Sequence, residues 1–109
     1  MYKVGDLVQC NSQYGNDTYH VRVVKVEARR CHVHVLNTRV IDTNPANPYD
    51  STTTYEVMDT VQCMRIANLS KAHGWSFFDE AGDRSSRVLL HTVIDPVPNP
   101  LRYTTTVYY

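Results

Sequence analysis

The sequence has no surplus of charge of either sign, because lysine and arginine together number 11, as do aspartate and glutamate. A neutral chain is not a general polyanion binder, so any contact with nucleic acid would need a local basic patch. No apolar run approaches the roughly 20 residues of a membrane helix, and no apolar signal segment follows Met1. We therefore expect no membrane partner and a cytoplasmic location, which is the host-cell interior if the protein is viral.

Cysteine is scarce and odd in number, with three residues in the chain. An odd number argues against a disulfide scaffold and fits a reducing compartment. Helix-forming residues are also few, whereas valine, threonine and tyrosine, which strands prefer, are frequent. A hydrophobic content of 42% is enough to build a core. We predict an all-β, strand-dominated fold.

The sequence repeats itself at an offset of 53 residues. The segment 4–10 returns as 57–63, and 40–42 returns as 93–95, within 17 identities over the 53 positions of the ungapped comparison. Ordinary composition gives about three matches by chance. We predict two diverged copies, residues 1–56 and 57–109. A unit of this size alone buries little surface, so the copies should pack with pseudo-twofold symmetry, as two small barrels or as one merged domain.

Copy one reads as a series of short strands. We predict strands over 6–10, 19–27, 31–35 and 39–42, and the start of another at 52–55. Apolar residues slip phase between Val23 and Val24, which indicates a bulge or a strong bend. Residues 28–30 form a tight turn. The segment 44–48, which contains two prolines, is predicted as a loop.

Copy two repeats this order, with strands over 75–80 and 87–94, a turn at 81–83 and a proline-containing loop at 96–100. A rival interpretation places a helix over 54–72, because Thr53 and Glu56 have the spacing of a capping box and Val57, Val61 and Met64 have helical spacing. The repeat argues against this helix, since the partner stretch begins with Gly5, which disfavours helix.

Copy one resembles the SH3-like small-barrel group, which includes the Tudor and KOW units. The resemblance rests on residues 3–8, 19–26 and 31–36, which follow the order of a G-D-x-V strand, a bent strand, a tight turn and another strand. In copy two, Met58 replaces Gly5 at the opening, so the match there is incomplete. The resemblance implies two tandem SH3-like β-units that bind peptide or nucleic acid without catalysis.

Cysteine and histidine recur together, because Cys10 and His20 return as Cys63 and His73. Two thiolates and two imidazoles could form one tetrahedral zinc site across the two copies. The spacing lacks the short C-x₂₋₄-C hairpin of familiar zinc modules, so cysteines in the core are the favoured interpretation. We expect no metal and no other cofactor.

The two copies differ most in their second strand and its turn. One copy is locally basic there, and the other is acidic and aromatic. Either these are two solvated faces, or one or both bind a partner through aromatic and charged anchors. The candidate binding residues are Arg22, Lys25, Arg29 and Arg30 in copy one and Trp75, Phe78, Asp79 and Glu80 in copy two.

The sequence contains no nucleophile elbow, phosphate loop or zinc-protease motif, so we expect no enzyme. A small neutral binding protein, an adaptor or inhibitor docking on a larger protein, is the leading hypothesis, and a phage or mobile-element protein is one such class. The alternatives are a nucleic-acid-binding module that uses the basic strand and a metal-binding protein that uses the Cys/His pairs. We also expect a homodimer through the regions 22–30 and 75–83.

Overall fold

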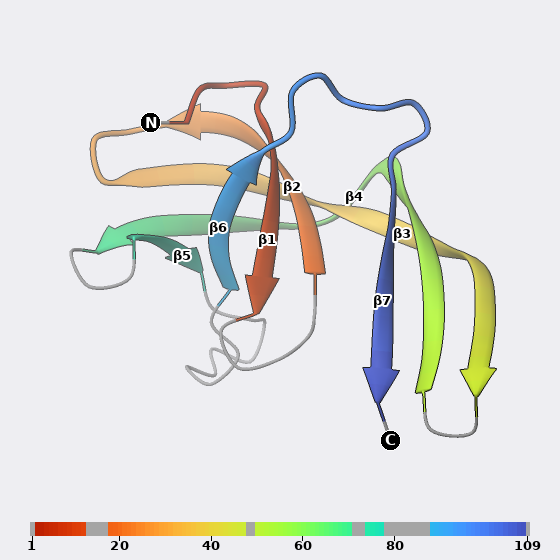
Figure 1. Ribbon diagram of the computed structural model, residues 1–109. Coiled ribbons are helices and arrows are strands. Elements are labelled where there is room, and N and C mark those ends of the chain that lie inside the picture. The colour runs from red at the N-terminus through yellow and green to blue at the C-terminus, as the bar shows by residue number, and fades with distance from the viewer. Residues whose placement is uncertain (1, 13–17, 48–49, 71–73, 78–87, 109) are drawn as a thin grey trace.

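The computed structural model describes residues 2–12, 18–47, 50–70, 74–77 and 88–108 (Figure 1). Within these ranges every regular element is a strand, so the predicted all-β fold is confirmed. No helix there has the length and apolar character needed to cross a membrane. The strands are β1 (Leu7–Ser12), β2 (Thr18–Val26), β3 (Arg30–Asn47), β4 (Asp50–Ser70), β5 (Gly74–Phe77), β6 (Val88–Val93) and β7 (Arg102–Tyr108).

Strands β1 to β6 form a closed barrel. Each strand pairs antiparallel with the next along the chain, and β6 pairs with β1. Closure leaves a barrel without free edges, so its backbone donors and acceptors are satisfied between neighbouring strands. This small six-stranded antiparallel barrel is compatible with the SH3-like small-barrel group.

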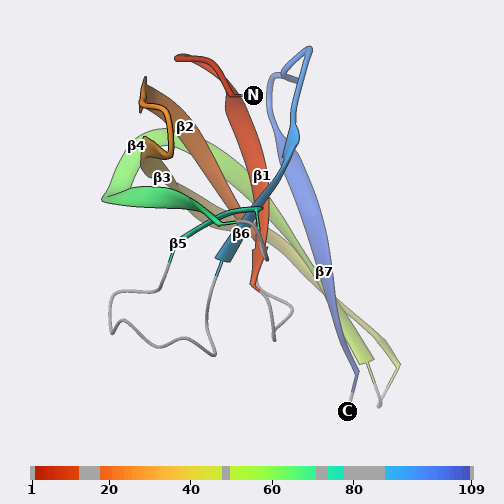
Figure 2. The ribbon, with the colours of Figure 1, turned by 90° about the vertical axis from the view of Figure 1, so that its left-hand side faces the viewer.

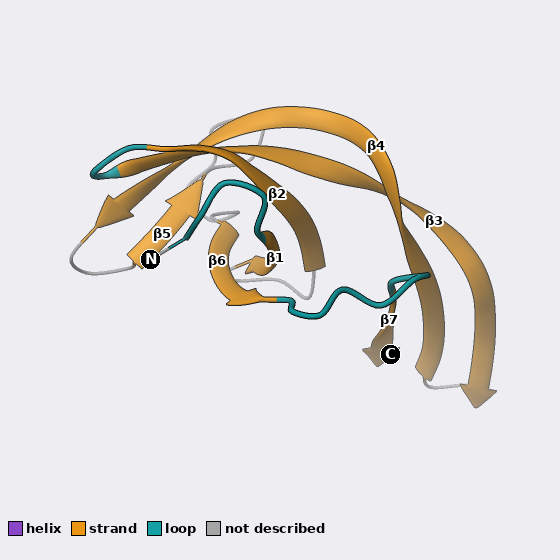
Figure 3. Ribbon diagram, turned by 90° about the horizontal axis from the view of Figure 1, so that it is seen from above, coloured by secondary structure: helices purple, strands orange, loops and turns teal. Residues whose placement is uncertain are grey.

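Two strands are longer than the barrel needs. β3 and β4 continue past it as a ladder that runs to the pair Asn47 and Asp50, and β7 pairs with the first half of β4. Residues 38–47, 50–56 and 102–108 therefore form a three-stranded sheet, which we call the arm, with β4 in its centre (Figures 1 and 2). Seen from above, β3 lies on the side of the arm away from the barrel (Figure 3).

The six strands of this barrel come from both predicted copies. The sequence left open two small barrels or one merged domain, and the structure has one barrel. The predicted boundary at 56–57 falls inside β4. Two successive meanders, β1–β3 and β4–β6, are compatible with a twofold relation. The duplication itself remains a prediction, because the strand order alone does not test it.

The alternation predicted from the sequence describes the wall of the barrel correctly. Cys31, Val33 and Val35 are buried in the core, while His32 and His34 between them are only partly covered. The predicted bulge is also present, since the register between β2 and β3 shifts between Val23 and Lys25. The other members of the barrel core are Val8, Cys10, Val21, Val23, Ala67, Phe77, Val88 and Leu90.

The structure differs from the sequence predictions in the arm. Residues 44–47, predicted as the start of a loop, continue β3. The reason is that Pro45 lies in a strand whose outer edge is unpaired, where a missing N–H costs no ladder bond. The rival helix over 54–72 is absent from the described part of this stretch, where β4 runs to Ser70 because it pairs on both sides.

An aromatic stack joins the arm to the barrel. The rings of Tyr55 and Tyr103 stack with centroids 5.1 Å apart, and the ring of His20 lies against Tyr103 at 4.9 Å. His20 is only 1% exposed, and its Nδ1 has no hydrogen-bond partner among the described residues. Burial without a partner lowers the pKa of His20, because a charged imidazole would lose its hydration there.

We expect the free energy of unfolding to decrease in acid through His20. The folded state holds this side chain neutral, so its contribution is complete above the unfolded pKa of about 6.5 and is lost as the pH falls through the folded pKa. A single group gives a slope of at most about 1.4 kcal/mol per pH unit. Urea unfolding from pH 8 to pH 5 should show a shallower dependence for His20→Phe than for the natural protein. Parallel profiles would exclude this role.

Candidate functional site

The outer surface of β2, β3 and β4 forms a continuous wall. Across the wall, Lys25 of β2 lies opposite His32 of β3, which in turn lies opposite Ile66 of β4. Two residues along β3, His34 lies opposite Met64 of β4. These side chains alternate with the buried core residues and so face away from the barrel interior. They line a shallow hollow of about 630 Å³, whose full lining is Val24, Lys25, His32, Val33, His34, Met64, Arg65 and Ile66.

The floor of this hollow is aliphatic and exposed. Met64 keeps 70% of its surface accessible, and Ile66 and Val24 are also exposed. Met64 and Ile66 face outward because their neighbours on β4, Cys63 and Ala67, pack with the core. Single exposed apolar residues are common on proteins, but three around one hollow form a contiguous patch of the kind that marks interaction sites. We call Val24, Met64 and Ile66 the wall patch.

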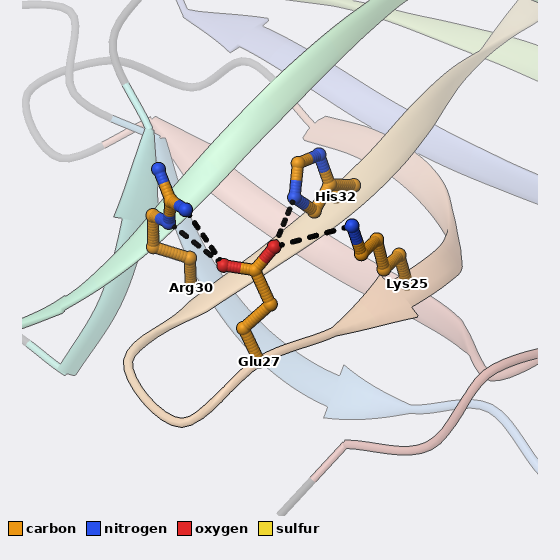
Figure 4. Close-up of polar contacts among 4 residues, drawn as sticks. All are labelled: Lys25, Glu27, Arg30 and His32. Atoms are coloured by element: carbon orange, nitrogen blue, oxygen red, sulfur yellow. Dashed lines mark hydrogen bonds and ion pairs between the residues drawn. The ribbon is translucent and has the colours of Figure 1, made fainter.

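Glu27 organises the basic residues at one end of the wall (Figure 4). Its Oε2 accepts hydrogen bonds from Nη2 and Nε of Arg30 at 2.8 and 3.0 Å, and its Oε1 lies 3.2 Å from Nε2 of His32 and 3.4 Å from Nζ of Lys25. The hairpin turn creates this arrangement, because the N–H of Glu27 donates to the carbonyl of Arg30 at 2.7 Å. The hydrogen bonds from Arg30 and then His32 lower the pKa of Glu27 to about 2.

One carboxylate does not neutralise this wall. Among the described residues at this end of the wall, Lys25 and Arg30 both pair with Glu27, and Arg29 lies in the same turn, so one carboxylate lies among three cations. The excess of positive charge around an aliphatic hollow fits a partner surface that is apolar with acidic residues at its rim.

The structure brings together part of the basic group of candidate binding residues. Lys25 and Arg30 meet at Glu27, and Arg29 lies in the adjacent turn, where its carbonyl accepts from the N–H of Leu69 at 3.0 Å. Arg22 donates to the carbonyl of Gly5 at 2.9 Å. The structure therefore brings together Lys25 and Arg30, with Arg29 beside them.

Trp75 lies on another side of the barrel from Lys25 and Arg30. Trp75 belongs to β5, which is three strands from β2 in either direction around the barrel. It is partly buried against the core, with its ring 6.2 Å from that of Tyr2. Phe78, Asp79 and Glu80 lie outside the described residues. Trp75 therefore does not lie beside Lys25 and Arg30.

The candidate metal ligands do not converge where they are described. Cys10 lies opposite Tyr19 and faces the core, while His20, the next residue on β2, faces the arm. Burial raises the pKa of the Cys10 thiol, and it raises that of Cys31 to about 11. Cys63 packs against the same core, and His73 lies outside the described ranges. In the described part of the chain, no group of three or more metal-ligating side chains forms.

Sequence reasoning identified the basic half of the wall and missed its aliphatic half. Met64 and Ile66 lie in the stretch that also fits helical spacing, which concealed their alternation with Cys63 and Ala67. Comparisons with protein-family models, curated proteins and solved structures found no match.

We expect Glu27→Gln to lower the free energy of unfolding at neutral pH, because it removes the negative charge that Lys25, Arg30 and His32 share. The pKa of Glu27 is depressed, so this contribution is complete above the ordinary value of 4.5 and disappears as the pH falls through about 2. Urea unfolding of both proteins should thus differ most above pH 5 and converge toward pH 2. A difference that grows in acid would contradict this assignment.

Proposed function

We propose that the protein is a non-enzymatic binding module that docks on an acidic and apolar surface of a larger protein. The observation that supports this function best is the wall patch, with its exposed aliphatic side chains beside cations ordered by Glu27. A closed barrel is a rigid platform for such a contact. Apolar anchors would supply most of the affinity, and the cations would set orientation and association rate.

The aliphatic character of the patch favours a protein partner over nucleic acid. Proteins that bind single strands stack bases on aromatic rings, and the residues that line the hollow include no phenylalanine, tyrosine or tryptophan. Its two rings are the imidazoles of His32 and His34, and His32 is paired with Glu27. A Tudor-like or KOW-like role therefore enters this proposal only as peptide or protein binding. An adaptor or an inhibitor, including one of phage or mobile-element origin, would work in this way.

Replacing one residue of the patch should weaken docking strongly. Met64→Lys places a charge at the most exposed apolar position of the wall, and loss of an anchor of this kind costs about 2 kcal/mol, or roughly a 30-fold weaker dissociation constant. The matched control is Val4→Lys, because Val4 is similarly exposed, at 66%, and does not line the hollow. Each protein would be used as bait in host extract, followed by isothermal titration of the purified partner.

The expected partner binds the natural protein and Val4→Lys but not Met64→Lys. Equal recovery with all three baits would show that the wall patch is not the docking surface. Recovery of nuclease-sensitive material whose binding weakens steeply with salt would instead establish the nucleic-acid alternative.

A further inference from the structure

The arm has a free edge on β3 that the barrel does not cover. Residues 38–43 pair with β4 on one side only, and in two views this edge faces away from the barrel (Figures 1 and 3). All six residues are exposed, including Val40 at 59% and Ile41 at 39%. An exposed edge strand with apolar residues is a ready site for pairing with another strand.

The backbone groups at this edge can be assigned from the ladder. The N–H of Val57 donates to the carbonyl of Leu101 at 2.9 Å, so alternate residues of β4 point toward β7 and the others, including Glu56, toward β3. Arg39 lies opposite Glu56 and directs its backbone groups to β4. Its neighbours Thr38 and Val40 therefore direct theirs to the free edge.

A bulge makes the edge of residues 38–43 complementary to the same edge of a second copy. The register shifts between Val40 and Asp42, so Asp42 rather than Ile41 pairs next with β4, and Thr43 then faces the free edge. Thr38 and Thr43 thus both direct their backbone groups to the free edge. In a regular strand, residues five positions apart would direct them to opposite sides. An antiparallel twofold contact would bring Thr38 of one copy to Thr43 of the other.

The side chains of the same segment are complementary under that twofold. Read in opposite directions, Thr-Arg-Val-Ile-Asp-Thr places Arg39 against Asp42 and Val40 against Ile41 of the second copy. Arg39 and Asp42 lie on one face of the arm, because their partners Glu56 and Thr54 are two residues apart on β4. Asp42 has no ion-pair partner within the described part of its own chain. Pro45 has no N–H to donate, so edge pairing with a second copy ends before it.

We propose that a second copy of this chain pairs with the β3 edge over residues 38–43, which joins two arms into one sheet around a twofold axis. The contact is isologous and closed, so it forms a dimer rather than a filament. Val40 and Ile41 form its apolar centre. Arg39, which pairs with Glu56 of its own chain at 3.2 Å and is otherwise exposed, also reaches Asp42 of the second copy, so two Arg39–Asp42 pairs lie beside the centre. It uses no residue of the wall patch, so it is independent of the proposed docking function.

Exchange of the two charges tests the contact. Sedimentation velocity should give the natural protein twice its chain mass of 12.5 kDa at high micromolar concentration. Asp42→Arg places arginine against Arg39, and Arg39→Asp places aspartate against Asp42. Each single variant should raise the dimer dissociation constant by about tenfold or more, since like charges directly opposite are destabilising. An equimolar mixture of the two variants should restore the dimer, because the unlike chains are complementary again.

The control is Asp95→Arg, which reverses the exposed aspartate at the position corresponding to Asp42 in the repeat and should leave the dimer unchanged. Circular dichroism checks that each variant folds, and recovery in the mixture excludes misfolding as the cause of the single effects. A natural protein that remains monomeric, a dimer that persists in Asp42→Arg, or folded variants that do not associate on mixing would each overturn the proposal.

Discussion

The rest of the structure depends on the paired strands β3 and β4, because this one ladder belongs to both the barrel and the arm. Within the barrel it closes the circle, because β3 there pairs with β2 on one side and with β4 on the other. Beyond the barrel the same ladder continues without β2, and β7 pairs with β4 only. The chain thus gains a protruding sheet in which β3 and β7 each pair with β4 on one side and, among the described residues, with no strand on the other. The stack of Tyr55, Tyr103 and His20 fixes that sheet to the barrel.

The barrel strands could be predicted from the sequence because each has one face in the core and the other toward solvent. A strand with one buried face alternates, as Cys31, Val33 and Val35 do against His32 and His34, and a phase slip such as that at Val23 and Val24 reveals a bulge. The arm was predicted only in part: the strands expected at 39–42 and 52–55 lie in β3 and β4, but the length of the ladder was not expected. Its residues 38–43 are exposed on both faces, so no alternation marks the strand, and Pro45 gives a loop signal in a position where an edge strand tolerates it.

The positive charge of the candidate site could be predicted from the sequence, but its geometry could not. The basic residues of β2 and its turn are evident from composition, but Glu27 was not recognised as the carboxylate that joins Lys25, Arg30 and His32. The aliphatic floor comes from β4, more than 30 residues away in the chain from β2. Only the pairing of β3 with β4 brings Met64 and Ile66 beside the histidines, and such non-local register is not encoded in local spacing.

Both proposed surfaces depend on a bulge. In a regular barrel wall the alternation would direct every second residue inward, and an extra residue breaks that rule. On β2 the extra residue is Val24, which lies outside the barrel and contributes to the wall patch. On β3 it is Ile41, which is exposed at the free edge and brings Thr38 and Thr43 into matching orientation. Both bulges expose an aliphatic side chain to water, where a polar one would be more favourable. Each of the two proposed contacts would bury that side chain.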